Sequence, residues 1–196
     1  PASAAVGNLQ AREQLAPEDK RALGRAGAAL VLPGQVVILD GGTTSLQVVQ
    51  HLPLNLRATV VTHSPTVAVA LAGHAQVEVL MLGGRLFRHS MVNVGASVVE
   101  AAAQLRVDLY LMGVTGVHAE TGLTTGDFEE AAVKRALHQR AAETVVLASL
   151  DKLGTASPFS VAPLRELAAL VVPAATPQAL RKKLQAGGAK VEIAAG

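Results

Sequence analysis

A run of glycine and hydroxyl residues follows the first strongly apolar stretch of the chain, residues 36–39. The run reads Asp40, Gly41, Gly42, Thr43, Thr44 and Ser45. Two adjacent glycines let the backbone approach a ligand closely, and a helix that begins after them points its free N–H groups at the same spot. The run therefore predicts either an anion cradle or a tight strand-to-helix turn capped by a threonine. It matches neither the G-x-G-x-x-G nor the P-loop pattern, so a nucleotide is not specifically indicated.

Glycine-bearing loops recur after later apolar stretches. The residues in them that could contact a ligand are Gly83, Gly84, Arg85, Gly113, Thr115, Gly116 and Gly122. Ligands of parallel α/β sheets bind at the edge formed by the carboxyl ends of the strands. Because several of these loops would lie at that edge, they favour a binding pocket over a set of unrelated turns.

Other polar side chains could complete this pocket. The candidates are Thr62, His63, Ser64, Lys134 and Lys152. Each of three candidates also has a structural interpretation. Lys134 could pair with Glu130 one helical turn away, Lys152 could be a solvated loop lysine, and His63 could be a capped loop histidine. Arg85 could instead lie on the surface, away from any ligand. The six histidines show no metal-ligand spacing with carboxylates, so no metal site, cofactor or catalytic residue is expected.

Composition narrows the class of protein. The chain has 196 residues, 50% of them hydrophobic and 2% aromatic, so the core is expected to be aliphatic and stacking platforms for bases are scarce. The net charge of +2 is too balanced for a nucleic-acid-binding surface. Since there is no cysteine, disulfides and zinc–thiolate sites are excluded. No signal peptide and no apolar stretch of about 18 residues is found, so a cytoplasmic location away from membranes is the default expectation.

The apolar stretches alternate with helical patterns. Strands are predicted at residues 36–39, 58–62, 77–82, 109–114, 144–148, 168–172 and, more weakly, 189–193. Helices are predicted at residues 17–31, 44–51, 65–72, 95–105, 128–141 and 177–186. Asp127, three residues before Glu130, has the arrangement of a capping box.

This alternation predicts an α/β fold. Near-continuous apolar strands separated by helices are typical of a mainly parallel sheet, here of about six or seven strands, with helices on both faces. Residues 1–13 are small and polar and are interpreted as a linker tail. Residues 14–196 are interpreted as one domain, because no internal repeat or second core is indicated.

The ordered motifs resemble those of the DeoR-type transcriptional repressors. Leu39 to Thr44 resembles the family's Asp-(Ser/Gly)-Gly-Thr-Thr element, and Glu130 to Arg135 resembles its Glu-x-x-Val-Lys helix. The matching segments, in the family's order and spacing, are 39–44, 60–64, 82–84, 108–116, 120–124 and 130–135. Each motif is weak alone, but the ordered set is specific.

The resemblance implies a fold related to ribose-5-phosphate isomerase, glucosamine-6-phosphate deaminase and CoA transferases. It also implies an effector-sensing domain whose ligand is a phosphorylated sugar or a related metabolite, and whose binding of that ligand releases the repressor from DNA. In the family a helix-turn-helix domain precedes the sensor, and homodimers or homotetramers are expected. One predicted helix in residues 1–35 cannot make a helix-turn-helix, so DNA binding is expected only through a domain that this chain lacks.

Three positions depart from the family pattern. His63 stands where the family usually has Asn. Ser149 stands where it usually has Asp, and an acid, Asp151, is found two residues later. Pro173-Ala174 follows the sixth apolar stretch, where Thr-Asp is usual. These departures leave the identity of the effector open and allow a weakened or altered response to it.

Two other functions are compatible with the same motifs. A sugar-phosphate isomerase or deaminase needs a positioned carboxylate as a base, and the segment 113–117 contains no acid. Asp127, Glu129 and Glu130 are explained as helix-start residues, so the residues favour a sensor over an enzyme. The other alternative is an oligomerisation module that has lost its ligand, since a fold does not fix a function.

Overall fold

The computed structural model describes residues 8–13 and 15–194. Its α-helices are α1 (Leu9–Glu13), α2 (Pro17–Ala29), α3 (Thr43–His51), α4 (Pro65–Ala70), α5 (Ala96–Ala103), α6 (Phe128–His138) and α7 (Gln178–Ala186). Short 3-10 helices are η1 (Leu71–Gly73), η2 (Leu150–Lys152) and η3 (Leu164–Glu166). Of the predicted linker tail, residues 1–7 lie outside the described residues, and Leu9–Glu13 form α1.

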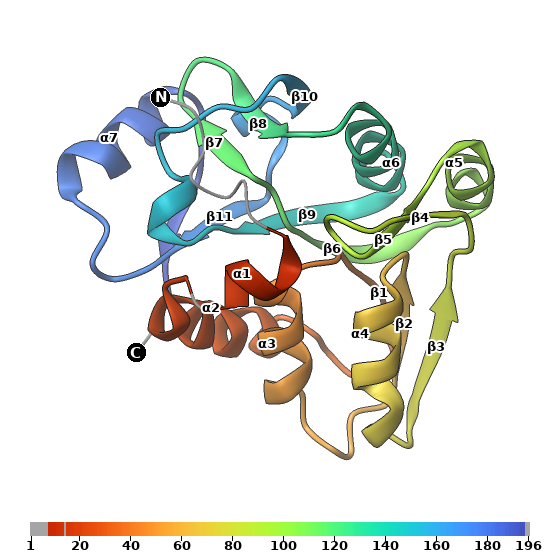
Figure 1. Ribbon diagram of the computed structural model, residues 1–196. Helices are drawn as coiled ribbons and strands as arrows, with labels where there is room; N and C mark the ends of the chain where they lie inside the picture. Colours follow the sequence, from red (N-terminus) through yellow and green to blue (C-terminus); the bar gives the residue numbers. More distant parts are fainter. Residues whose placement is uncertain (1–7, 14, 195–196) are drawn as a thin grey trace.

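A sheet of seven strands runs through the centre of the domain, in the order β12-β11-β9-β6-β1-β2-β3 (Figure 1). Its strands are β1 (Val36–Leu39), β2 (Ala58–Thr62), β3 (Val77–Met81), β6 (Val107–Met112), β9 (Ala141–Leu147), β11 (Ala169–Val172) and β12 (Val191–Ile193). Each neighbouring pair is parallel. The predicted α/β fold with a parallel sheet is therefore confirmed.

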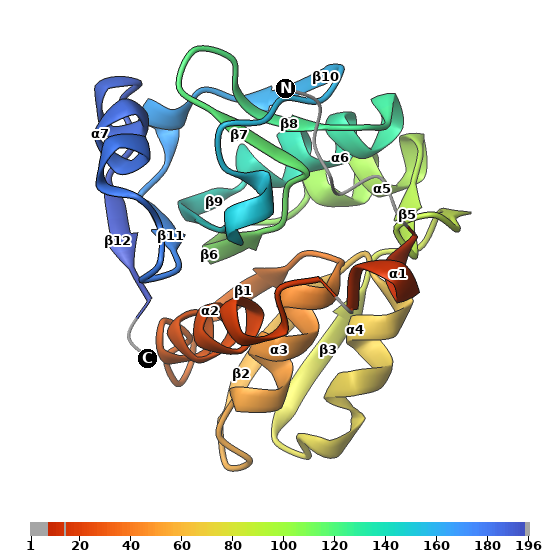
Figure 2. The same cartoon turned by 60° about the vertical axis from the view of Figure 1, so that its left-hand side comes forward.

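The central strands send alternate side chains into two cores. Ile38 and Tyr110 pack into one buried cluster, whereas Leu39 and Leu111, their neighbours in sequence, pack into the other. This is the period-two alternation of a strand buried on both faces. Figure 2 shows α2, α3 and α4 on one side of the sheet and α5, α6 and α7 on the other. The prediction of helices on both faces is confirmed.

Two small antiparallel sheets were not predicted. One has the order β10-β8-β7 and the other pairs β4 with β5. Their strands are β4 (Arg85–Phe87), β5 (Val92–Val94), β7 (Gly116–His118), β8 (Gly122–Thr125) and β10 (Phe159–Ala162). Strands of this length carry too few residues to show a periodic pattern, and their glycines favoured a loop interpretation. The predicted helix 128–141 was too long, because β9 already begins at Ala141. No helix in the described part of the chain is long and apolar enough to cross a lipid bilayer.

Candidate functional site

The loop between β1 and α3 lies at the carboxyl edge of the sheet, between the ends of β2 and β6. Gly42 has a φ of 111°, which residues with a side chain rarely adopt. A Cβ atom on Gly41 would lie only 2.2 Å from Cγ1 of Val92. Local geometry therefore requires both glycines. They lead directly into α3, which begins without a side-chain cap.

Asp40, the last residue before these glycines, is completely buried, and its carboxylate is surrounded by donors. The donors are the backbone N–H groups of Gly41 and Gly113, Nε2 of His63, the hydroxyl of Tyr110 and Nζ of Lys134, at distances from 2.6 to 3.0 Å. An ionised carboxylate offers about four lone-pair sites. The hydrogen-bonding capacity of Asp40 is therefore used up within the protein.

The charges around Asp40 stabilise one another. Nζ of Lys134 lies 2.6 Å from Oδ2 of Asp40 and 3.6 Å from Oε1 of Glu130. Burial raises the pKa of Asp40, but the charge of Lys134 and the hydrogen bond from His63 outweigh burial and hold that pKa well below its ordinary value of 3.8. Burial lowers the pKa of Lys134, but the two carboxylates outweigh it and raise that pKa above 10.5. The buried ion pair is therefore formed throughout the neutral pH range.

Two buried rings hold Asp40 from the neighbouring strands. Nε2 of His63 faces Asp40, and its Nδ1 lies 2.9 Å from the carbonyl oxygen of Asn93. These two contacts fix the orientation of the imidazole ring between β1 and the residues of β5. Burial and the charge of Asp40 raise the pKa of Tyr110 well above its ordinary value of 10.0, so the phenol stays a donor.

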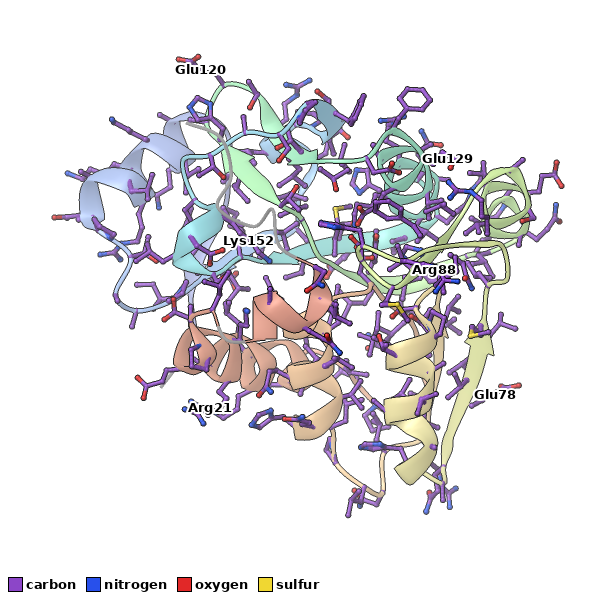
Figure 3. The ribbon with its side chains drawn as sticks, viewed as in Figure 1. Arg21, Glu78, Arg88, Glu120, Glu129 and Lys152 are labelled. Atoms are coloured by element: carbon purple, nitrogen blue, oxygen red, sulfur yellow. The ribbon has the colours of Figure 1, made fainter. Side chains whose placement is uncertain are left out.

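A cleft opens on the other side of the β1–α3 loop. Its walls come from the loops after β1, β6 and β9, from the β4–β5 loop, from α6 and from the segment around the start of α2. The cleft is narrow, with a cavity volume of about 30 Å³. Lysines outnumber carboxylates in its wall: Lys20, Lys134 and Lys152 face Glu130 and Asp151. Figure 3 shows Lys152 near the centre of the molecule. With Asp40, which pairs with Lys134 from behind the loop, three lysines meet three carboxylates around the cleft, so the uncapped helix N-terminus is the feature that favours an anion.

Two buried polar atoms in the cleft wall have no hydrogen-bond partner among the described residues. They are Oγ1 of Thr44, in the first turn of α3, and Oδ1 of Asp151, in η2. Thr44 is only 6% exposed. A buried polar atom without a partner costs free energy unless water or a ligand binds it. Within the cleft, the threonine hydroxyl can donate to a ligand and the carboxylate oxygen can accept from one.

The structure separates the predicted contact residues into three groups. Those that line the cleft are Gly41, Gly42, Thr43, Thr44, Gly113, Thr115, Lys134 and Lys152. Those buried behind the β1–α3 loop, and not in the cleft wall, are Asp40, Thr62, His63 and Ser64. Those outside the cleft wall, on neighbouring loops and small strands, are Gly83, Gly84, Arg85, Gly116 and Gly122.

Residues outside the wall have structural contacts instead. Ser64 caps α4, because its Oγ accepts from the backbone N–H of Val67 at 3.4 Å. Arg85 forms an exposed ion pair with Glu129, as its surface alternative predicted. A Cβ atom on Gly84 would lie 2.6 Å from Cγ2 of Val98, so this glycine allows α5 to pack closely.

Sequence reasoning did not place several wall residues at a ligand. They are Leu15, Lys20, Ser90, Val114, Glu130 and Asp151. Ser45 also lines the cleft, and it belongs to the run that the sequence predicted as an anion cradle. Lys20 reaches the cleft because α2 packs on α3, a contact that no local motif announces. Asp127 caps α6 as predicted, by accepting from the backbone N–H of Glu130 at 2.9 Å, whereas the carboxylate of Glu130 faces Lys134.

Metal binding has no support in the part of the chain that the structure describes. No group of three or more His, Cys, Asp or Glu side chains there could hold a metal ion.

A family model described as the DeoR C-terminal sensor domain matches residues 15–173. This chain belongs to the DeoR family. Its relatives include the HTH-type transcriptional repressor GlcR of Bacillus subtilis (strain 168), 32% identical over 188 residues that cover 96% of this chain and 72% of the relative. The HTH-type transcriptional regulator GlpR of Haloferax volcanii is 31% identical over 174 residues, which cover 89% of this chain and 68% of the relative. The family resemblance of the motifs is thus confirmed.

Solved structures share the fold of this DeoR-family domain. Ribose 5-phosphate isomerase A of Methanocaldococcus jannaschii aligns with a TM-score of 0.50 at 18% identity, over 69% of this chain and 54% of the isomerase. The translation initiation factor eIF-2B of Pyrococcus horikoshii OT3 aligns with a TM-score of 0.53 at 16% identity, over 79% of this chain and 62% of that factor. At these identities the likeness shows the fold alone, and the predicted relation to the isomerase fold is confirmed.

Proposed function

We propose that this domain senses a phosphorylated sugar, or a closely related metabolite, for a transcriptional regulator. The observation that carries the proposal is the uncapped N-terminus of α3, which opens onto the cleft with the hydroxyl of Thr44 unpartnered beside it. Backbone N–H groups and the helix dipole make such a terminus a good phosphate site. The relatives named as transcriptional regulators support the regulatory part of the proposal.

The contacts follow from the cleft wall. The phosphate would lie on the loop 41–45 and accept a hydrogen bond from Thr44. Lys134 or Lys152 would complete the neutralisation of its charge. Asp151 would accept from a hydroxyl group of the sugar, and the segment 113–115 would border the rest of the ligand.

The residues buried behind the loop would position it rather than contact the ligand. Asp40 has no lone pair left for a ligand, and His63 and Tyr110 hold it in place. The predicted contacts at Thr62 and Ser64 are revised in the same way, because neither residue lines the cleft. In the proposal these side chains keep the loop rigid enough to bind phosphate without reorganisation.

Effector binding would reach the DNA through the N-terminal segment. Leu15 and Lys20 form part of the cleft wall, and α1 precedes them. A sugar phosphate is larger than this cleft, so its binding would require this segment to move and would favour the position that opens the cleft. A helix-turn-helix domain attached before α1 would then change its position relative to that of a second subunit, and with it the half-site spacing it fits. We infer that the regulator is a homodimer or homotetramer and that it acts in the cytoplasm.

One observation favours a rival function, a sugar-phosphate isomerase. Oδ1 of Asp151 lines the cleft without a partner, so a carboxylate is available as a base. We nevertheless expect no turnover, because the other carboxylate of the wall, Glu130, is paired with Lys134 and the residues after β6 add no acid. Incubation of the domain with each sugar phosphate, followed by analysis for the isomerised product, checks this directly.

A thermal-shift screen against sugar phosphates and the corresponding free sugars tests the sensor proposal. Binding raises the melting temperature with the logarithm of ligand concentration over Kd, so even a weak effector is visible at millimolar levels. We expect a shift with at least one phosphate and none with its free sugar. The double variant Thr43→Val, Thr44→Val should lose that shift while melting close to the wild type.

The matched control is Thr121→Val, an exposed threonine in the turn between β7 and β8 and outside the cleft wall. It should bind the effector as the wild type does. Unchanged affinity in the double variant would overturn the phosphate site. The absence of a shift with every compound would favour the oligomerisation module instead.

A further inference from the structure

β3 is an edge strand of the seven-stranded sheet (Figure 1). It pairs with β2, and no other strand of the described chain pairs with it. Val79, Leu80 and Met81 are 36%, 46% and 48% exposed. Edge strands are usually protected from pairing with other chains by lysine, proline or a bulge. β3 has none of these, and its only charged residue is Glu78.

The backbone of β3 offers hydrogen bonds to a further strand. The N–H of Leu82 donates to the carbonyl oxygen of Thr62 at 2.8 Å, so this residue faces β2. Because successive residues of a strand point their backbone groups in opposite directions, Leu80 also faces β2. Val79 and Met81 therefore direct their N–H and C=O groups at the open edge. In a protein complex, another extended strand satisfies such a row of alternating donors and acceptors.

We propose that β3 pairs antiparallel with β3 of a second copy of this chain, on a two-fold axis at Leu80. In this register Val79 lies opposite the partner's Met81, and the two residues exchange both backbone hydrogen bonds. Leu80 lies opposite the partner's Leu80 as a non-hydrogen-bonded pair, in which side chains approach most closely. The two central sheets then form one continuous sheet.

The charge of Glu78 favours one register of this pairing over another. An axis at Glu78 would place two carboxylates directly opposite each other, which is destabilising. The axis at Leu80 places Glu78 opposite the partner's Leu82, at the end of the paired segment. Figure 3 shows Glu78 pointing outward from β3, where it can remain in solvent. With its charge placed there, the strand is complementary to itself, with apolar side chains opposite apolar side chains along its centre.

The opposite edge of the sheet is protected. β12 has only three residues, Val191–Ile193, and carries Glu192 paired with Lys190 at 3.2 Å. A short strand with charged side chains is a poor template for pairing. The contrast between the two edges supports β3 as the dimerisation edge.

The chain has no cysteine, so a single introduced thiol tests the register directly. In the proposed pair the two Leu80 Cα atoms are about 4.5 Å apart, which is within the range of a disulfide. Leu80→Cys should therefore form, under mild oxidation, a species of twice the 20.0 kDa mass of the chain. Ile193→Cys, 48% exposed on the opposite edge, is the matched control and should not.

A second variant tests the surface without a crosslink. Val79→Lys together with Met81→Lys adds charges at exposed positions, so the fold should be retained. Sedimentation velocity should show that this variant has half the mass of the wild type. A cooperative melting transition should show that the variant is still folded. A monomeric wild type at micromolar concentration, or equal crosslinking at Ile193 and Leu80, would overturn the proposal. None of these readouts depends on effector binding.

Discussion

Two regions on opposite sides of the β1–α3 loop differ in how their polar groups are satisfied. Behind the loop, donors on neighbouring strands and on α6 occupy the whole carboxylate of Asp40. In front of it, the cleft wall leaves Thr44 and Asp151 each with an unpartnered buried oxygen. The first pattern is typical of a structural network and the second of a binding surface. Residues four positions apart in one motif, Asp40 and Thr44, thus have different roles.

The comparison predicts its largest effect at Asp40. Asp40→Asn leaves Lys134 buried with only Glu130 as a charged partner, 3.6 Å away. Loss of one partner of a buried ion pair costs about 3–5 kcal/mol, so the free energy of unfolding in urea should fall by that amount. In the wild type the same stabilisation is complete above pH 3.8 and is lost as the pH falls through the lowered pKa of Asp40.

Asp108→Asn is the control for this substitution. Asp108 is exposed on β6, and its Oδ2 accepts from the backbone N–H of Val36 at 2.8 Å. Its loss should cost no more than about 1.5 kcal/mol, the usual net value of one hydrogen bond. Equal losses in the two variants would break the comparison, because Asp40 would then be no more structural than a surface acid.

An alkaline titration of Tyr110 tests the same buried network without a substitution. Tyr110 is the only tyrosine and the chain has no tryptophan, so its ionisation is visible without interference. The folded state holds the phenol proton above pH 10.0, whereas the unfolded state releases it there. Stability should therefore fall as the pH rises above 10.0. Tyrosinate absorbance and the loss of circular dichroism should appear together. Tyrosinate formation near pH 10 in a chain that remains folded would show that the network is open to solvent.

The smallest effect on stability is expected at Asp151. Since Oδ1 of Asp151 has no partner, Asp151→Asn should change the free energy of unfolding by less than about 0.5 kcal/mol. Its effect should appear in calorimetric binding: affinity for the sugar phosphate should fall roughly tenfold, the value of one charge-assisted hydrogen bond. Affinity for inorganic phosphate should not fall. A large loss of stability would instead place Asp151 with the structural network.

The order of strands and helices could be predicted because the central strands are buried on both faces and read as continuous apolar runs. The loop 41–45 could be predicted because its chemistry is local. Leu15, Lys20 and Ser90 could not, since packing between elements distant in sequence brings them to the cleft. The inward orientation of Asp40 could not be predicted either, because it depends on donors from other strands.

One wall of the cleft comes from Leu15 and Lys20, on the segment that leads into and begins α2. In the proposed site, the start of the matched sensor domain therefore lies in the cleft wall itself. A chimeric regulator joined after Leu15 would exchange part of its ligand specificity together with its DNA-binding half. In such a protein the domain that binds the metabolite and the linker to the DNA-binding domain cannot be exchanged independently.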